Sequence, residues 1–102
     1  MDTNTLINHS RARFDHAVAR RVLREKYQAK MTFAYQGGLF KAGPKLLSLL
    51  QTCIASDSMV IEDLYQNPIR IKPQELHQIA FERWQEQMNA WQVEFDQLNQ
   101  KR

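Results

Sequence analysis

The chain has 102 residues, a net charge of +3 and a single cysteine, Cys53. This length predicts one domain, spanning residues 1–102, with a small core, and the lone cysteine excludes an internal disulfide and favours a reducing compartment. The sequence lacks an apolar run of about 18 residues, which argues against a membrane-spanning helix and membrane partners.

The charge is divided unevenly along the chain. Residues 1–30 contain seven lysines and arginines against three acids, whereas residues 57–102 contain eight acids against five lysines and arginines. A basic N-terminal third and an acidic C-terminal half can attract each other within one fold or between molecules.

The basic segment, residues 4–30, is predicted to be a helix. Its apolar residues form two adjoining stripes, the first of Ile7, Phe14, Val18 and Val22 and the second of Leu23 and Tyr27. Arginines and lysines surround these narrow stripes, so the helix is expected to need a partner surface for stability.

Residues 31–72 are expected to form a hairpin, a helix and a second hairpin. Alternating apolar residues from Met31 onward predict a strand, and Gln36-Gly37-Gly38 supplies a turn. Pro44 suits the first turn of a helix whose leucines predict burial on most sides. Ile69 and Ile71 alternate with cations, as in a strand with one buried face.

Residues 73–100 are predicted to form a long amphipathic helix. Its apolar residues repeat with steps of four and three, at Trp84, Met88, Trp91, Phe95 and Leu98. The helix is too long for a small sheet to cover, so its far end is expected to pack on the N-terminal helix or on another chain. These five residues are therefore predicted either to join the core or to form a partner interface.

The predicted order is α-β-β-α-β-β-α, which belongs to the α+β class. Long terminal helices flank two short hairpins, in a small antiparallel sheet, and one buried helix. The pattern does not decide whether the two hairpins join into one sheet.

The sequence shows no pattern typical of an enzyme. The histidines His9, His16 and His77 lack the spacing and neighbours of a zinc site, and no glycine-rich phosphate loop is present. Cys53 lies among leucines, where a structural thiol is expected. The sequence therefore predicts no catalytic residue, no metal, no cofactor and no small-molecule substrate.

The cations of the first helix are candidate contacts for an anionic partner. These are Arg13, Arg20, Arg21 and Arg24, spaced so that most of them share one side of a helix. Such cations suit either the phosphates of a nucleic acid or an acidic protein surface. The aromatic residues Phe33, Tyr35 and Phe40 can stack on bases in the first case, but a place in the core explains them more simply.

Three segments carry a resemblance to a known group of proteins. They are Gly38-Leu39-Phe40-Lys41-Ala42, the stretch from Asp63 to Ile71 (DLYQNPIRI) and Met88-Asn89-Ala90-Trp91. Together they resemble small uncharacterised proteins of tailed bacteriophages. The resemblance implies an accessory or virion-associated protein, found in the host cytoplasm or the virion, and assigns no binding residue.

Two functions follow as hypotheses. The first is a non-enzymatic interaction or assembly protein that binds other protein subunits, its own copy or a foreign chain, through the C-terminal helix. The second is a nucleic-acid-binding accessory protein that uses the basic helix.

Overall fold

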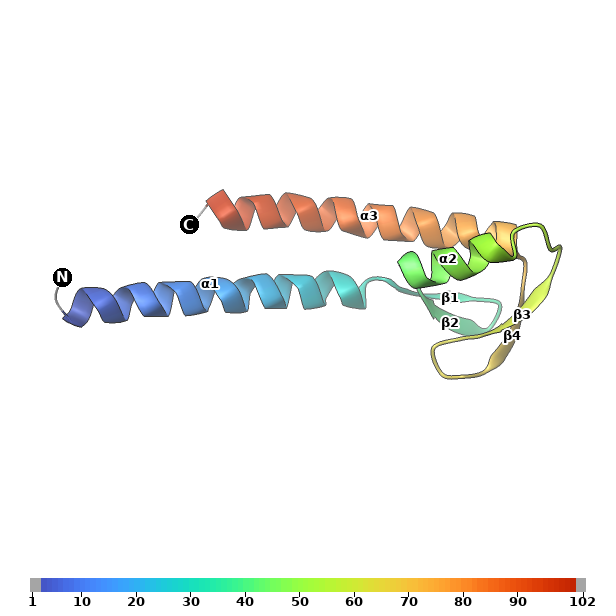
Figure 1. The fold of residues 1–102 in the computed structure, drawn as a ribbon, viewed down its shortest axis with the longest axis horizontal. Coiled ribbons are helices and arrows are strands. Elements are labelled where there is room, and N and C mark those ends of the chain that lie inside the picture. The colour runs from blue at the N-terminus through green and yellow to red at the C-terminus, as the bar shows by residue number, and fades with distance from the viewer. Residues whose placement is uncertain (1–2, 101–102) are drawn as a thin grey trace.

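The computed structural model describes the backbone of residues 3–100 and the side chains of residues 12–100. The elements follow in the order α1 (Thr3–Ala29), β1 (Thr32–Tyr35), β2 (Gly38–Lys41), α2 (Pro44–Thr52), β3 (Met59–Glu62), β4 (Pro68–Ile71) and α3 (Pro73–Gln100). This is the α+β order that the sequence predicts. We call α2, the four strands and the first turns of α3 the head (Figure 1).

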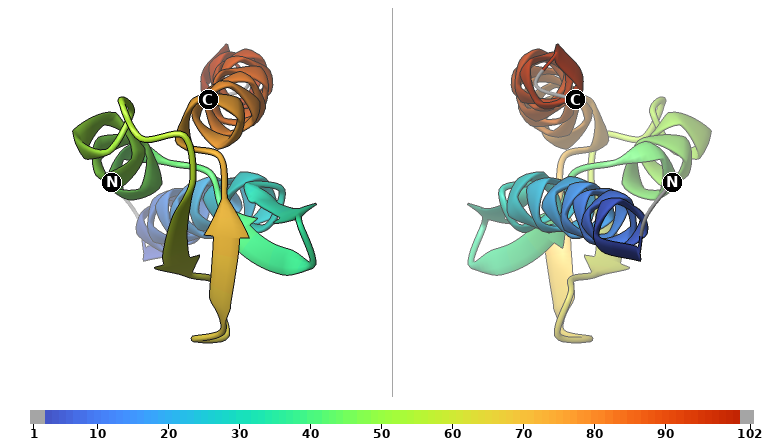
Figure 2. Two further views of the ribbon diagram at one scale, coloured as in Figure 1. Left: turned by 90° about the vertical axis from the view of Figure 1, so that its right-hand side faces the viewer. Right: turned by 90° about the vertical axis from the view of Figure 1, so that its left-hand side faces the viewer.

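Beyond the head, α1 and the rest of α3 run antiparallel as a two-helix arm (Figures 1 and 2). The molecule measures 67 × 24 × 20 Å, and its radius of gyration is 19.4 Å. A compact chain of this length has a radius of gyration of about 13 Å. The N-terminal end of α1 extends past the C-terminal end of α3 in Figure 1. The arm therefore places much of the chain outside the core.

The first hairpin pairs β1 with β2, with Phe33 opposite Phe40 and Tyr35 opposite Gly38. Gln36 and Gly37 connect the strands with positive φ angles of 51° and 83°. Two successive positive φ angles are typical of the tight turn that matches the twist of a hairpin.

The second hairpin pairs β3 with β4 and forms a separate two-stranded sheet. Two hydrogen bonds at Leu39 join the hairpins: the Leu64 amide donates to the Leu39 carbonyl oxygen over 2.8 Å, and the Leu39 amide donates to Asp63 Oδ2 over 3.1 Å. The hairpins therefore act as one unit without sharing a ladder.

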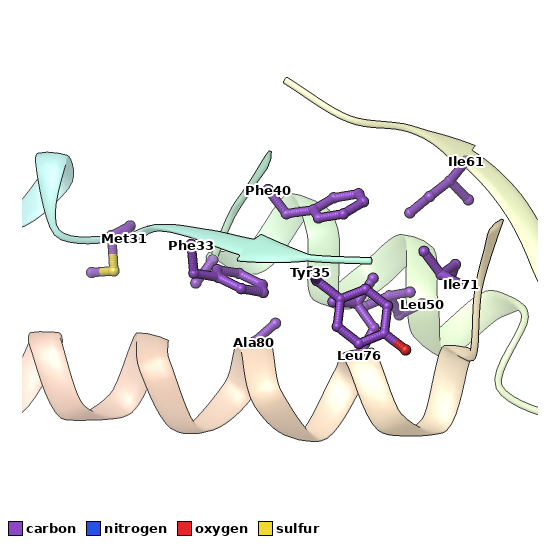
Figure 3. Close-up of a cluster of buried hydrophobic side chains, with 10 residues drawn as sticks. Met31, Phe33, Tyr35, Phe40, Leu50, Ile61, Ile71, Leu76 and Ala80 are labelled. Carbon is purple, nitrogen blue, oxygen red and sulfur yellow. The ribbon is translucent and has the colours of Figure 1, made fainter. Parts of the chain in front are cut away.

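The core lies where the first hairpin meets the first turns of α3. Met31, Phe33 and Tyr35 project from the β1 side toward Leu76 and Ala80 (Figure 3). The complete cluster of buried residues is Met31, Phe33, Tyr35, Phe40, Ala42, Leu50, Ile61, Ile71, Leu76 and Ala80. Because Phe33, Tyr35 and Phe40 are all buried in it, these aromatic rings do not present a base-stacking surface.

Helix α2 is less buried than its leucines predict. Only Leu50 is fully buried, Leu46 and Leu47 are partly covered, and Leu49 is exposed. The helix covers one side of the core at its edge, while Leu76 and Ala80 of α3 take the central place. The uncovered side of α2 borders a groove described below.

Candidate functional site

The five apolar residues predicted on the last helix form a row along α3, which we call the α3 row: Trp84, Met88, Trp91, Phe95 and Leu98. All five are partly exposed. Trp84 and Met88, at the end of the row nearest the head, pack against the core. Trp91, Phe95 and Leu98 continue along the arm. A pair of helices covers each such side chain from one direction only, so these residues stay partly exposed.

The two helices of the arm are fastened at Glu94. Lys26 Nζ lies 2.8 Å from Glu94 Oε1, and the Tyr27 hydroxyl donates to the same oxygen over 2.6 Å. These two hydrogen bonds hold the pKa of Glu94 below its ordinary value. The bond to Glu94 raises the pKa of Lys26 and that of Tyr27. Nearer the head, Arg83 donates to the Lys30 carbonyl oxygen over 3.3 Å.

On α1, the second apolar stripe faces the partner helix and the first stripe does not. Tyr27 is buried and Leu23 is half-buried. Phe14 and Val22 are 69% and 55% exposed, and Val18 between them is half-buried. These three residues line an open groove of about 470 Å³ that reaches Glu94. The stripe that the sequence predicts to need a partner surface is thus left open by the chain's own α3.

The four candidate arginines, Arg13, Arg20, Arg21 and Arg24, are all exposed on α1. Among the residues whose side chains the structure describes, none of them forms an ion pair, and Lys26–Glu94 is the one pair present. Arg13, Arg20 and Arg24 are separated by seven and four residues, so they share one face of the helix; we call them the basic row. Four residues after Arg24 the same face reaches Gln28.

A second groove, of about 700 Å³, lies between the head and the base of the arm, and we call it the head groove. Its apolar lining comes from Met31, Phe40, Leu46, Leu49, Leu64 and Trp84. Gln28 of α1 and the cations Lys41 and Lys45 also line it. The sequence pattern does not predict this groove, because four separate segments have to meet to form it.

Two acids also border the head groove, Glu62 and Asp63. Asp63 Oδ1 accepts from the amides of Tyr65 and Asn67 over 2.9 Å each, and Oδ2 accepts from the Leu39 amide. These backbone donors, chiefly Asn67, hold the pKa of Asp63 below its ordinary value. Asp63 is therefore an ionised structural carboxylate that organises the β3–β4 turn.

The remaining reactive side chains are dispersed. Cys53 is half-buried, with its thiol near the carbonyl oxygens of Leu49 and Leu50. His77 stacks on Phe81 along α3. Among the described side chains, no three histidine, cysteine or acidic residues gather as metal ligands, and His9 lies outside that range.

Two polar atoms in the arm are enclosed without a hydrogen-bond partner among the described residues. They are His16 Nε2 on α1 and Trp91 Nε1 on α3. An enclosed donor or acceptor without a partner costs about 1–3 kcal/mol. The packing of the arm is therefore incomplete in polar as well as apolar terms.

Comparison of the chain with protein-family models, curated proteins and solved structures found no match. Between residues 3 and 100, no helix has the length and apolar character needed to cross a membrane.

Proposed function

We propose that this protein is a non-enzymatic interaction or assembly protein that binds other protein subunits through its arm. The observation that carries the proposal is the partial exposure of the α3 row beyond the core. Among the described helices only α1 runs beside Trp91, Phe95 and Leu98 (Figure 1), so a third helix that would complete their cover is missing there. Large apolar side chains that stay partly exposed next to one another can anchor a contact with another protein.

The open stripe on α1 supports the same proposal. Phe14 and Val22 are more than half exposed, although helices of this length gain most of their stability from packing an apolar face. In helix bundles, four helices commonly surround and bury the apolar faces, whereas the arm of this protein supplies two helices. A partner's helices on the arm would complete such a bundle. In keeping with the resemblance to phage proteins, the proposed setting is a virion or an accessory complex.

The proposal is tested by the size of the protein in extracts of the cells that encode it. A free chain has a mass of 12.1 kDa. We expect the wild-type chain to migrate in a larger complex, and Phe95→Asp to return it to the monomer position. Val93→Asp is the matched control, because two residues along a helix lead to the opposite face and Val93 is already exposed. Migration of the wild-type chain as a monomer would contradict the proposal.

The second candidate function is nucleic-acid binding by the exposed arginines. Nucleic-acid binding is favoured because these four exposed arginines form no ion pair with any side chain that the structure describes. Binding that rests on phosphates weakens steeply with salt. Charge reversal at Arg20 and Arg24 should then abolish retention of nucleic acid at low salt, and unchanged retention would exclude these residues.

A further inference from the structure

The basic row on α1 and the α3 row both lead into the head groove. Gln28 lines the groove, and Arg24 and Arg20 lie one and two turns before it on the same face of α1. Trp84 also lines the groove, and Met88 and Phe95 follow it along the same face of α3. Both sets of residues singled out in the sequence therefore lead to the same groove, and we call the groove together with the two rows the docking face.

The chemistry of the docking face combines an apolar floor with a cationic border. Leu46, Leu49 and Trp84 form part of the floor in the head groove, and Met88 and Phe95 extend it onto the arm. Arg20 and Arg24 border the arm section, while Lys41 and Lys45 border the groove. Two acids also border the groove: Asp63, whose oxygens are both engaged by backbone amides, and the exposed Glu62, so the four cations outnumber the acids.

We propose, resting on the function proposed above, that the docking face binds an acidic amphipathic helix of another protein. The apolar residues of that helix would enter the head groove and lie along the α3 row, and its carboxylates would meet the arginines and lysines. Helix-in-groove binding uses apolar anchors spaced by three and four residues, which matches the floor described here.

The charge distribution argues against a second copy of this chain as the occupant. In a two-fold dimer the same surface meets itself, so docking face against docking face would bring the two basic rows together. Two exposed acids of α3 lie elsewhere: Glu82 and Glu86 are each two residues from Trp84 and so are on the opposite side of the helix, while Glu94 is already paired with Lys26. Pairing these acids with the docking face of a second copy would require a head-to-tail contact in place of the two-fold contact that most dimers use.

The experiment measures binding of synthetic peptides to the full-length protein by tryptophan fluorescence. The acidic probe has about 18 residues, roughly 27 Å as a helix, with leucines at helical spacing and glutamates elsewhere. The comparison probe has lysines in place of the glutamates. We expect the acidic peptide to bind at least about tenfold more tightly than the basic one, a difference of about 1.4 kcal/mol.

Variants then place the peptide on the docking face. The double change Arg20→Glu and Arg24→Glu should weaken the acidic peptide by about tenfold or more, and Leu49→Asp should weaken it through the floor. Arg70→Glu is the matched control, since Arg70 is exposed on β4, outside the groove lining, and should change binding less than about twofold. Circular dichroism confirms that each variant is folded.

Three results would overturn the inference: equal binding of the acidic and basic peptides, no effect of the double arginine reversal, or a stable dimer of the protein alone that the reversal dissolves. If a short DNA duplex binds through Arg20 and Arg24 and the acidic peptide does not bind, the docking face is a nucleic-acid site and the inference is overturned. If the acidic peptide does not bind but Phe95→Asp still disrupts a complex in cell extracts, the proposed function stands and only the acidic helix is rejected as the partner.

Discussion

Gly38 lies where the two hairpins touch, and adding one methyl group there should destabilise the head. A Cβ atom at this position would lie 2.7 Å from Ile69 Cγ1 and 3.2 Å from Phe40 Cε2. Favourable carbon contacts are about 3.5–4.0 Å, so both neighbours would have to move. Phe40 is 2% exposed and has little room, whereas Ile69 is half-buried and can rotate in part.

Overpacking of this kind costs about 1–3 kcal/mol, and the freedom of Ile69 favours the lower half of that range. For a domain of this size each kcal/mol lowers the melting temperature by about 4–8 °C, so Gly38→Ala should lower it by about 4–16 °C. The assay is thermal and urea unfolding followed by circular dichroism.

A double-mutant cycle isolates the contact. Ile69→Ala removes both Ile69 carbons that the new methyl group would meet. In that background Gly38→Ala should therefore cost much less, with a coupling free energy of at least about 1 kcal/mol. A Gly38→Ala variant as stable as the wild type, or a cost independent of residue 69, would refute the argument.

Three further predictions concern the core and the carboxylates. Leu76→Ala should lower the free energy of unfolding by about 2–5 kcal/mol because Leu76 is fully buried. Phe95→Ala should lower it by less because Phe95 is partly exposed, and urea unfolding compares the two variants. The pKa of Asp63 is lower in the folded state, so its stabilising contribution should be complete above about pH 4 and should disappear as the pH falls through the folded pKa. In the Asp63→Asn variant the free energy of unfolding should therefore fall less steeply with decreasing pH than in the wild type. An equally steep fall in both proteins would reject this role for Asp63. The hydrogen bond to Glu94 raises the pKa of Tyr27, so the stability that this bond contributes should be lost as the pH rises through the folded pKa of Tyr27, above about 10. Glu94→Gln should therefore lose less stability at alkaline pH than the wild type. An equal loss in both proteins would contradict this role for the bond.

Local patterns predicted the elements well because each carries its own physical signal. Pro44 and Pro73 are the first residues of α2 and α3, where proline fits a helix well. Gly37 accepts the positive φ of the first turn. Alternation placed Ile71 inside and Arg70 outside, as the structure has them. Each of these sequence features determines the conformation of only a few neighbouring residues, and the secondary structure that it predicts is the one found in the fold.

The degree of burial was harder to predict, because it depends on which segments meet. The leucines of α2 predicted a buried helix, but the helix is short and lies at the edge of the core, where Leu49 stays exposed. The apolar stripe of Phe14 and Val22 predicted a partner surface, yet α3 covers the adjoining stripe instead. The head groove could not be predicted, since Gln28, Leu49 and Trp84 come together only in the fold.

The central claim is that the arm, along the α3 row, is a protein interface. It is tested most directly by placing a photo-reactive phenylalanine analogue at position 95 of the full chain, in the cells that encode it, with position 93 as the control on the opposite face. The account predicts a discrete crosslinked protein adduct from position 95 and none from position 93. No adduct from position 95, or the same adducts from both positions, would contradict it.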